Sequence, residues 1–263
     1  MATTMGLLSG RVAIVTGASK GIGRVMSQIF AREGAKVVCV ARSTTLVEET
    51  AALIRADGGT AIAITADLGR EDDVREMVKK AVSTFGHVDC LVNNAGDGGP
   101  TKPVQDYPME DWLYTVNSCL TSSYLCTRFA VPAMINAGRG AIVNIASMAG
   151  RRGLAYRIGY CSAKAGQIGM TVGLAMELGR HNITVNAIAP GAVAGDRIDR
   201  VIAGQADARG IGVEQMRKSF VDRSPLRRMS TAEDIANLAM FLCSDLARSI
   251  SGQCVPVTAG EPG

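Results

Sequence analysis

The chain has 263 residues, of which 47% are hydrophobic and 20% charged, so it can bury one large apolar core. Its formal net charge of +4 is scattered, without the basic runs typical of proteins that bind nucleic acids. Because there is neither a cationic segment followed by an apolar one at the start nor a later bilayer-length apolar stretch, we expect a cytoplasmic protein without membrane or nucleic-acid partners.

The cysteines and histidines argue against a disulfide framework and a metal site. The seven cysteines form no CxxC pair, and an odd number fits reduced thiols. The only two histidines, His87 and His181, have no second ligand at metal-binding spacing, so we expect no bound metal.

Short β-rich runs alternate with longer helical patterns along the chain. The expected strands are residues 12–16, 36–40, 61–65, 88–92, 141–145, 184–188 and 254–257, and the expected helices are 22–33, 46–56, 72–85, about 109–135, about 158–178 and 232–244. This rhythm is typical of βαβ units and predicts an α/β fold with a parallel sheet. Residues 191 to about 228 are only weakly helical, and we expect them to form a small lid.

A glycine-rich turn, TGASKGIG at residues 16–23, follows the first expected strand and opens a helix. Glycines let the backbone approach a pyrophosphate, whose charge is favoured by free N–H groups at a helix N-terminus. The spacing differs from the common dinucleotide fingerprint, and a tight turn that simply needs glycine is the alternative. In this strand–turn–helix setting we interpret the segment as a dinucleotide site.

The end of the second expected strand indicates which dinucleotide binds. An NAD site usually places an acidic residue about 20 residues beyond the glycines. Here the strand is followed by Arg42, which together with Lys20 can pair with a 2′-phosphate. We therefore expect NADP(H) in preference to NAD(H); the alternative is that both side chains are solvated surface charges.

The segment Tyr160-Cys-Ser-Ala-Lys164 opens a helix, with Ser147 just past the preceding strand. Residues four apart share a helical face, so the lysine ammonium can lie close to the phenol and favour its ionised form. Such a tyrosine can exchange a proton with an alcohol or ketone oxygen that the serine hydroxyl holds. On its own, this spacing is mostly found on ordinary helix surfaces, so the interpretation depends on the rest of the chain.

Further motifs supply that context. In chain order they are TGASKGIG, Asp67-Leu68, Asn93-Asn94-Ala95-Gly96, Asn117, Ser147, Tyr160 with Lys164, and Asn186-Ala-Ile-Ala-Pro190-Gly191. Together they closely resemble the short-chain dehydrogenase/reductase family, in its 3-oxoacyl reductase-like branch, over nearly the whole chain. The resemblance implies a Rossmann-type, doubly wound parallel sheet in a single domain over residues 1–263. It also implies an NADP-dependent oxidoreductase that interconverts a secondary alcohol and a ketone.

The resemblance implies roles for individual residues. Tyr160 would be the general acid/base, Lys164 would support its ionisation and hold the nicotinamide ribose, and Ser147 would position the substrate oxygen. Asn117 would support a proton-relay water; a helix-interior polar residue bonded to the backbone is the alternative. The implied cofactor contacts are Gly17, Ser19, Lys20, Gly21, Ile22, Gly23, Arg42, Asp67, Leu68, Asn94, Ala95, Gly96, Tyr160, Lys164, Pro190, Gly191 and Val193.

Two departures from the family pattern stand near the end of the chain. A threonine that commonly follows the Pro-Gly pair and binds the nicotinamide carboxamide is absent from Pro190-Gly191-Ala-Val-Ala-Gly195-Asp196. This leaves the carboxamide contact and the alignment of the lid unassigned. The last strand is followed by Thr258-Ala-Gly260 where relatives often carry an Asp-Gly pair, a difference that concerns oligomer packing.

The segments expected to line the substrate pocket are rich in arginine: Arg151, Arg152, Arg157, Arg197 and Arg200. We hypothesise that Arg157, with Arg197, clamps a carboxylate, sulfonate or phosphate of the substrate, because arginine suits bidentate anion recognition. The protein would then be an NAD-dependent dehydrogenase of a small anionic alcohol. The alternative is that these arginines are solvated or salt-bridged.

Two other function classes remain. A dinucleotide-binding sensor without catalysis is disfavoured by the intact Ser147, Tyr160 and Lys164. The second class keeps the tyrosine and lysine but assigns epimerase or dehydratase chemistry to them. It is disfavoured because the longer relatives with that chemistry usually add a C-terminal substrate domain, for which this chain has no room.

The helix after Tyr160 carries small residues, namely Ala163, Ala165, Gly166, Gly169 and Gly173, which allow another helix to approach closely. With the family's habit, they suggest a homotetramer; a close approach within the fold, against the sheet, is the alternative.

Overall fold

Seven parallel strands form one sheet in the order β3-β2-β1-β4-β5-β6-β7. The computed structural model describes residues 6–262. The strands are β1 (Val12–Thr16), β2 (Lys36–Ala41), β3 (Thr60–Thr65), β4 (Cys90–Asn93), β5 (Gly140–Ile145), β6 (Ile183–Pro190) and β7 (Cys254–Val257). All five residues of β1 are buried, because helices cover both faces of the sheet. The expected α/β fold is confirmed: β1 and β7 have the expected bounds, and each end of the other strands lies within two residues of its expected place.

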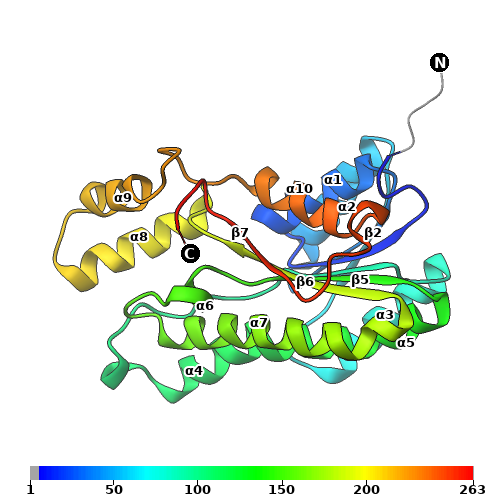
Figure 1. The fold of residues 1–263 in the computed structure, drawn as a ribbon, viewed down its shortest axis with the longest axis horizontal. Helices are drawn as coiled ribbons and strands as arrows, with labels where there is room; N and C mark the ends of the chain where they lie inside the picture. Colours follow the sequence, from blue (N-terminus) through cyan, green and yellow to red (C-terminus); the bar gives the residue numbers. More distant parts are fainter. Residues whose placement is uncertain (1–5, 263) are drawn as a thin grey trace.

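Helices form a layer on each face of the sheet (Figure 1). One layer contains α1 (Gly21–Arg32), α2 (Thr44–Ala56) and α10 (Ala232–Leu242), and the other contains α3 (Glu71–Phe85), α4 (Met109–Val116), α5 (Ser122–Ala137) and α7 (Ile158–Leu178). In α1 the buried residues include Gly23, Met26, Phe30 and Ala31, a spacing that places them on one helical face. Each layer therefore packs its own hydrophobic core against the sheet.

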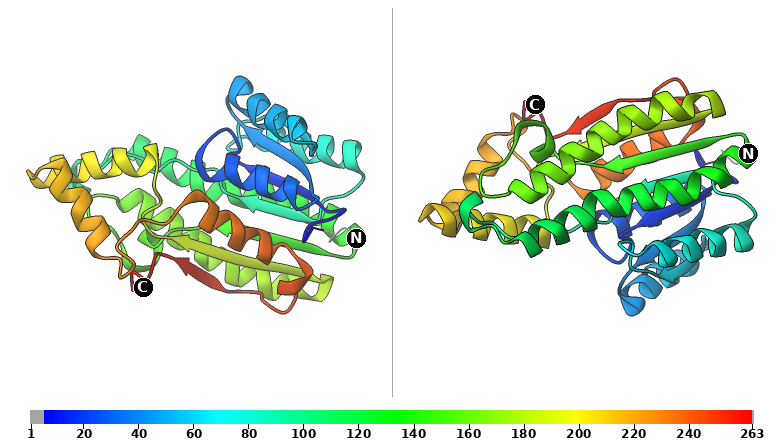
Figure 2. Two further views of the ribbon diagram at one scale, coloured as in Figure 1. Left: turned by 90° about the horizontal axis from the view of Figure 1, so that it is seen from above. Right: turned by 90° about the horizontal axis from the view of Figure 1, so that it is seen from below.

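The strand order reverses at β1, which pairs with β2 on one side and β4 on the other. In sheets of this kind, ligands bind outside the carboxyl ends of the strands near such a reversal. Two helices, α8 (Asp196–Arg209) and α9 (Val213–Asp222), project beyond this end of the sheet (Figure 2). The fold therefore leaves room for a site between the strand ends and these two helices.

The expected lid is more regular than its sequence pattern indicates. Helices α8 and α9 pack on each other around a small cluster of their own that includes Ile202, Ala206 and Met216. Glycine ends α8, because Gly210 adopts the left-handed conformation with φ of 63°. The short apolar faces of the two helices gave only a weak periodic signal.

The helix expected over residues 109–135 is interrupted at its centre. A π-helical turn, Asn117–Thr121, joins α4 to α5. Such a turn accommodates one extra residue and rotates the side chains on either side of it relative to a regular helix. A short helix that the sequence pattern did not predict, α6 (Ala149–Arg152), follows Ser147, and 3-10 turns occupy Val104–Asp106, Gly179–His181 and Asp245–Ala247.

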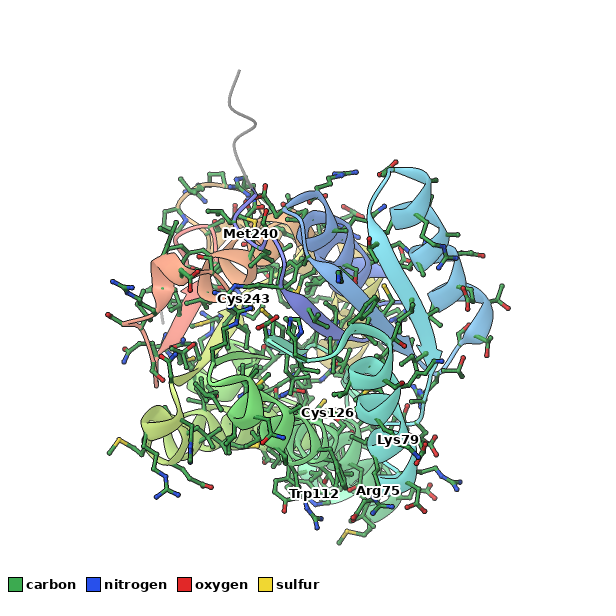
Figure 3. The ribbon with its side chains drawn as sticks, turned by 90° about the vertical axis from the view of Figure 1, so that its right-hand side faces the viewer. Arg75, Lys79, Trp112, Cys126, Met240 and Cys243 are labelled. Carbon is green, nitrogen blue, oxygen red and sulfur yellow. The ribbon has the colours of Figure 1, made fainter. Side chains whose placement is uncertain are left out.

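The cysteines are dispersed through the molecule. All seven are free thiols, and only Cys161 and Cys254 are half-exposed. Cys126 and Cys243 lie in the two cores on opposite sides of the sheet (Figure 3). Burial raises the pKa of Cys39 to about 11 and that of Cys126 to about 12.

Within residues 6–262, no cluster of three or more His, Cys, Asp or Glu side chains is arranged to hold a metal ion. No helix in that range has the length and apolar character needed to cross a membrane.

Candidate active site

One cavity of about 1040 Å³ opens at the carboxyl ends of the strands, between the sheet and α8. All the sequence-predicted site residues except Asn117 line it: Gly17, Ser19, Lys20, Gly21, Ile22, Gly23, Arg42, Asp67, Leu68, Asn94, Ala95, Gly96, Ser147, Arg157, Tyr160, Lys164, Pro190, Gly191, Val193 and Arg197. Residues far apart in the chain therefore share one site, because parallel strands end at the same edge of the sheet.

The glycine-rich turn forms one end of the cavity at the start of α1. A Cβ on Gly23 would lie 2.2 Å from the carbonyl oxygen of Gly17, so only glycine allows this close approach. Gly21 has a φ of 55°, and a Cβ there would meet nothing within 4 Å. The first residues of α1 line the cavity, and free N–H groups at a helix N-terminus favour a pyrophosphate there.

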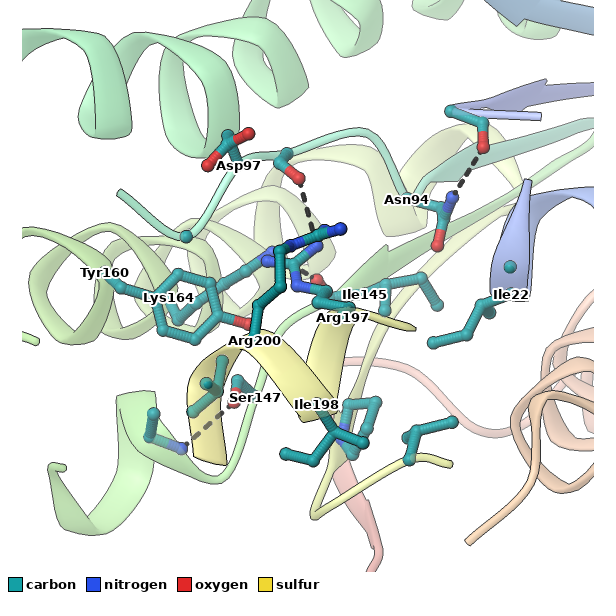
Figure 4. Close-up of a pocket in the computed structure, with 18 of the residues that line it drawn as sticks. Ile22, Asn94, Asp97, Ile145, Ser147, Tyr160, Lys164, Arg197, Ile198 and Arg200 are labelled. Atoms are coloured by element: carbon teal, nitrogen blue, oxygen red, sulfur yellow. Dashed lines mark hydrogen bonds between the residues drawn. The ribbon is translucent and has the colours of Figure 1, made fainter. Parts of the chain in front are cut away.

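Asn94 braces this turn from the end of β4. Its amide nitrogen donates to the carbonyl oxygen of Thr16 at 2.9 Å. It also lies 3.4 Å from the carbonyl oxygen of Gly17 (Figure 4). The hydroxyl of Thr16 accepts from the backbone N–H groups of Asn94 and Ala95 at 2.9 and 3.0 Å. Thr16 and Asn94 together hold β1 and β4 at a fixed spacing, a role of Thr16 that the sequence reasoning missed.

The residues expected to select the dinucleotide stand beside the turn. Lys20 and Arg42 are both exposed and line the cavity. Arg42 lies 3.4 Å from the hydroxyl of Tyr114, and that hydrogen bond is the largest cause of the raised pKa of Arg42. No carboxylate directly follows β2, since Arg42 and Ser43 stand after its last residue, Ala41.

Tyr160 and Lys164 lie on one face of α7, opposite Ser147. The Lys164 ammonium is 5.7 Å from the centre of the Tyr160 ring. It donates to the carbonyl oxygen of Ile145 at 2.6 Å, which fixes the lysine to the end of β5. The hydroxyl of Ser147 accepts from the N–H of Ala149 at 3.1 Å (Figure 4). The Ser147 hydroxyl oxygen is thus engaged as an acceptor, and the hydroxyl proton is left to donate to a ligand in the cavity.

A buried chain of polar side chains supports Lys164 from behind. Its ammonium donates to the side-chain oxygen of Gln167 at 2.8 Å, and the Gln167 amide donates to the hydroxyl of Ser123 at 2.6 Å. Ser123 in turn donates to the carbonyl oxygen of Cys119. The sequence reasoning missed Gln167, although its place three residues after Lys164 on the same helix face could have indicated the contact.

Asn117 stands at the start of the π-helical turn and does not line the cavity. Its side chain is exposed and accepts from the hydroxyl of Thr121 at 3.1 Å. Ser118 and Ser122 line the cavity from this part of the chain instead. The buried Cys119 thiol donates to the carbonyl oxygen of Asp97 at 3.0 Å. Asn117 opens the π-helical turn, which changes the direction of the side chains and could not be predicted from linear spacing.

Arginines surround the phenol of Tyr160. The guanidinium carbons of Arg157 and Arg197 lie 5.4 and 5.5 Å from the ring centre. Arg157 is 5% exposed and donates to the carbonyl oxygen of Gly98 at 2.8 Å, whereas Arg197 is exposed and donates to that of Gly96 at 3.0 Å. Burial is the largest cause of the lowered pKa of Arg157. The two arginines lie beside Tyr160, but only Arg197 is open to solvent, and the anion clamp stays a hypothesis.

The lid is attached to the rest of the site by polar contacts. Gln205 on α8 donates to the carbonyl oxygen of Ala155 at 2.8 Å. Near the C-terminus, the buried Glu261 lies 2.6 Å from Arg152 and 3.7 Å from Arg223, at the end of α9. Glu261 therefore links the C-terminal segment, the loop after Ser147 and the lid.

Comparison with known proteins extends the resemblance seen in the motifs. A family model described as enoyl-(acyl carrier protein) reductase matches residues 17–261. A 3-oxoacyl-[acyl-carrier-protein] reductase of Synechocystis sp. is 36% identical over 258 residues, which cover 97% of this chain and 98% of that protein. A 7alpha-hydroxysteroid dehydrogenase of Escherichia coli strain K12 is 36% identical over 253 residues, covering 96% and 94%.

Solved structures agree with these matches. A crystal structure of NAD+-bound xylitol dehydrogenase has a TM-score of 0.93 at 30% identity, covering 96% of this chain and 99% of that one. A levodione reductase has a TM-score of 0.91 at 30% identity, covering 96% and 97%. The chain belongs to the short-chain dehydrogenase/reductase family of oxidoreductases.

Proposed function

We propose that this protein interconverts a secondary alcohol and a ketone with NADP(H), with Tyr160 as the general acid/base. The observation that carries the proposal is the convergence of Ser147, Tyr160 and Lys164 in the cavity whose other end is the glycine-rich cradle. A single cavity then holds both a dinucleotide and the groups that act on a substrate oxygen.

In the reductive direction, Ser147 donates a hydrogen bond to the ketone oxygen, and Tyr160 donates its proton to the same oxygen as the alcohol forms. Lys164 and the two neighbouring arginines stabilise the negative charge that Tyr160 acquires when its proton leaves. Oxidation of the alcohol reverses both steps. A bound nicotinamide dinucleotide supplies or takes up the hydride at the carbonyl carbon.

The cradle residues Gly17, Gly21 and Gly23 would hold the pyrophosphate, and Asp67 and Leu68 would border the adenine. Lys20 and Arg42 would pair with a 2′-phosphate, which favours NADP(H). NAD(H) is the second candidate, because an NAD+-bound relative shares the fold at 30% identity.

A homotetramer is part of the proposal. Ala165, Gly169 and Gly173 are exposed along α7, and a Cβ on either glycine would meet nothing within 4 Å. The nearby Val172 and Met176 are 50% and 85% exposed. An open, apolar helix face of this kind fits another helix of a second copy better than an internal contact.

The test is the initial rate of NADPH and NADH oxidation with a panel of neutral and anionic ketones. Turnover of at least one ketone, with a higher kcat/KM for NADPH than for NADH, is the expected result. Tight binding of a dinucleotide without turnover of any ketone or alcohol would favour a non-catalytic sensor. Binding of neither dinucleotide would remove the proposal.

A further inference from the structure

Positive charge gathers around the reacting end of the cavity. Besides Arg42, which stands beside the glycine-rich turn, five arginines line the cavity: Arg152, Arg157, Arg197, Arg200 and Arg223. Arg152 and Arg223 share the carboxylate of Glu261. Within residues 6–262, the other three form no ion pair with a carboxylate, although Asp97, Asp196 and Asp207 line the same cavity. Three arginines without a direct ion pair therefore stand at the substrate end, with Asp97 acting on Arg197 from a longer distance.

Arg157 is the least accessible of the three. Two of its nitrogens are committed to the loop that follows β4, one to the carbonyl oxygen of Gly98 at 2.8 Å and one to the hydroxyl of Thr101 at 3.3 Å. Its Nε is buried without a hydrogen-bond partner. Burying a cation without an anionic partner is strongly unfavourable. An anion bound in the cavity near this guanidinium would therefore be stabilised by it.

Arg197 and Arg200 are the arginines that an anion in the cavity can contact directly. They are three residues apart on α8 and therefore share a helical face. Both are exposed, and Figure 4 shows their side chains beside Tyr160 and Ser147. Arg197 donates from one terminal nitrogen to the carbonyl oxygen of Gly96 and also makes a side-chain hydrogen bond with Tyr160, so only part of its guanidinium remains for a ligand. No hydrogen bond of the Arg200 side chain to another residue is seen within residues 6–262.

We propose that Arg197 and Arg200 bind an anionic group of the substrate, a carboxylate, sulfonate or phosphonate joined by a short spacer to the reacting carbonyl. Arg157, which the sequence analysis assigned to the clamp itself, is in this proposal a positioning residue that holds the loop and adds positive potential. The spacer is short because the guanidinium carbon of Arg197 is only 5.5 Å from the ring of the residue that protonates the carbonyl oxygen. This inference rests on the proposed ketone–alcohol function.

The same contacts are compatible with a second role, in which Arg197 acts only on the charge of Tyr160. The phenol of Tyr160 is the largest cause of the raised pKa of Arg197. A role of this kind affects every substrate alike and shifts the pH profile of kcat. An anion-binding role changes the preference between charged and neutral substrates, so the two roles have different kinetic signatures.

The experiment compares acetoacetate, 4-oxopentanoate and 2-oxopropylphosphonate with their methyl esters as neutral counterparts, using NADPH in both cases. For the wild-type protein we expect kcat/KM for the best anionic ketone to exceed that for its ester at least tenfold. This ratio should fall at least tenfold in Arg197→Met and in Arg200→Met, and further in the double variant, because each loses charge-assisted hydrogen bonds. Arg151→Met is the matched control: Arg151 is an exposed arginine beside the site that does not line the cavity, and its ratio should stay at the wild-type value.

Each contrary result has its own meaning. If Arg197→Met lowers kcat/KM equally for anionic and neutral ketones and shifts the pH profile of kcat, Arg197 acts only on the charge of Tyr160, and the proposal is overturned. Turnover of esters without any preference for the anions would overturn it while leaving the ketone–alcohol function intact. If no ketone turns over, the proposed function fails, and calorimetric titration of the three anions into the NADP+-saturated protein still decides the anion site. Binding to the wild-type protein that is lost in the double variant would support the site, and binding of none of the anions would exclude it.

Discussion

The side-chain oxygen of Gln167 accepts from the Lys164 ammonium at 2.8 Å, and both residues are almost completely buried. With the carbonyl oxygen of Ile145 at 2.6 Å, Gln167 fixes the position of the charge beside Tyr160. A buried hydrogen bond to a charged group contributes about 1.5–3 kcal/mol, so the lysine is held in a narrow range of positions.

We predict that Gln167→Leu lowers kcat at least tenfold and displaces the pH dependence of kcat, because Lys164 loses one of its two acceptors. Gln167→Glu retains an acceptor for the ammonium and should recover most of the activity. Steady-state rates from pH 6 to 9 provide the measurement. An unchanged pH profile in the leucine variant would show that Gln167 serves packing alone.

Gly98 accommodates the guanidinium of Arg157. A Cβ at this position would lie 2.1 Å from the Arg157 terminal nitrogen. Gly98→Ala should therefore displace the buried arginine, lower the free energy of unfolding by about 1–3 kcal/mol and weaken substrate binding. Gly212→Ala is the control, because a Cβ there meets nothing within 4 Å and the φ of Gly212 is −67°. The measurement is the free energy of unfolding of the two variants in urea. Equal values for Gly98→Ala and Gly212→Ala would contradict the predicted displacement of Arg157.

Arg42 should determine the choice of dinucleotide. Arg42→Ala is expected to reduce the ratio of kcat/KM for NADPH over NADH at least tenfold, since a 2′-phosphate loses its bidentate partner. Arg32→Ala removes an exposed arginine that pairs with Asp57 outside the cavity, and it should leave the ratio unchanged. A ratio that stays at the wild-type value in Arg42→Ala would show that Arg42 is a surface charge.

The buried thiols should make the protein less stable at high pH. Burial raises the pKa of Cys126 from 9.0 to about 12, so between these values the unfolded chain binds fewer protons than the folded one. The free energy of unfolding then falls as pH rises above about 9. Between pH 8 and 10 we expect the wild-type protein to lose about 1 kcal/mol more than Cys126→Ala does. Identical pH dependence in urea unfolding would show that the thiol ionises equally in both states.

Local patterns predicted most of the sheet. The β-branched strands and the glycine-rich turn are determined by residues close in sequence, so β1 and the start of α1 appear within a residue or two of their expected places. The convergence of Ser147, Tyr160 and Lys164 followed from the rule that parallel strands end at one edge of the sheet and that residues four apart share a helix face.

What could not be predicted depends on contacts between distant segments. The π-helical turn that points Asn117 to solvent has no periodic signature, because it is one extra residue within a continuous helix. The burial of Arg157 is set by the loop at Gly98, 59 residues earlier in the chain. The lid helices α8 and α9 bury only a small cluster, so their apolar faces were too short to indicate two helices.

The role of Tyr160 is the centre of the account, and Tyr160→Phe tests it most directly. Fluorescence titration with NADPH and the rate of ketone reduction are measured on the same preparations of wild-type and variant protein. We predict that the variant still binds NADPH, within about tenfold of the wild-type Kd, while kcat falls at least a hundredfold because the general acid is lost and Ser147 remains only as a hydrogen-bond donor to the substrate oxygen. Reduction by Tyr160→Phe at the wild-type rate would contradict the assignment of Tyr160 as the general acid/base.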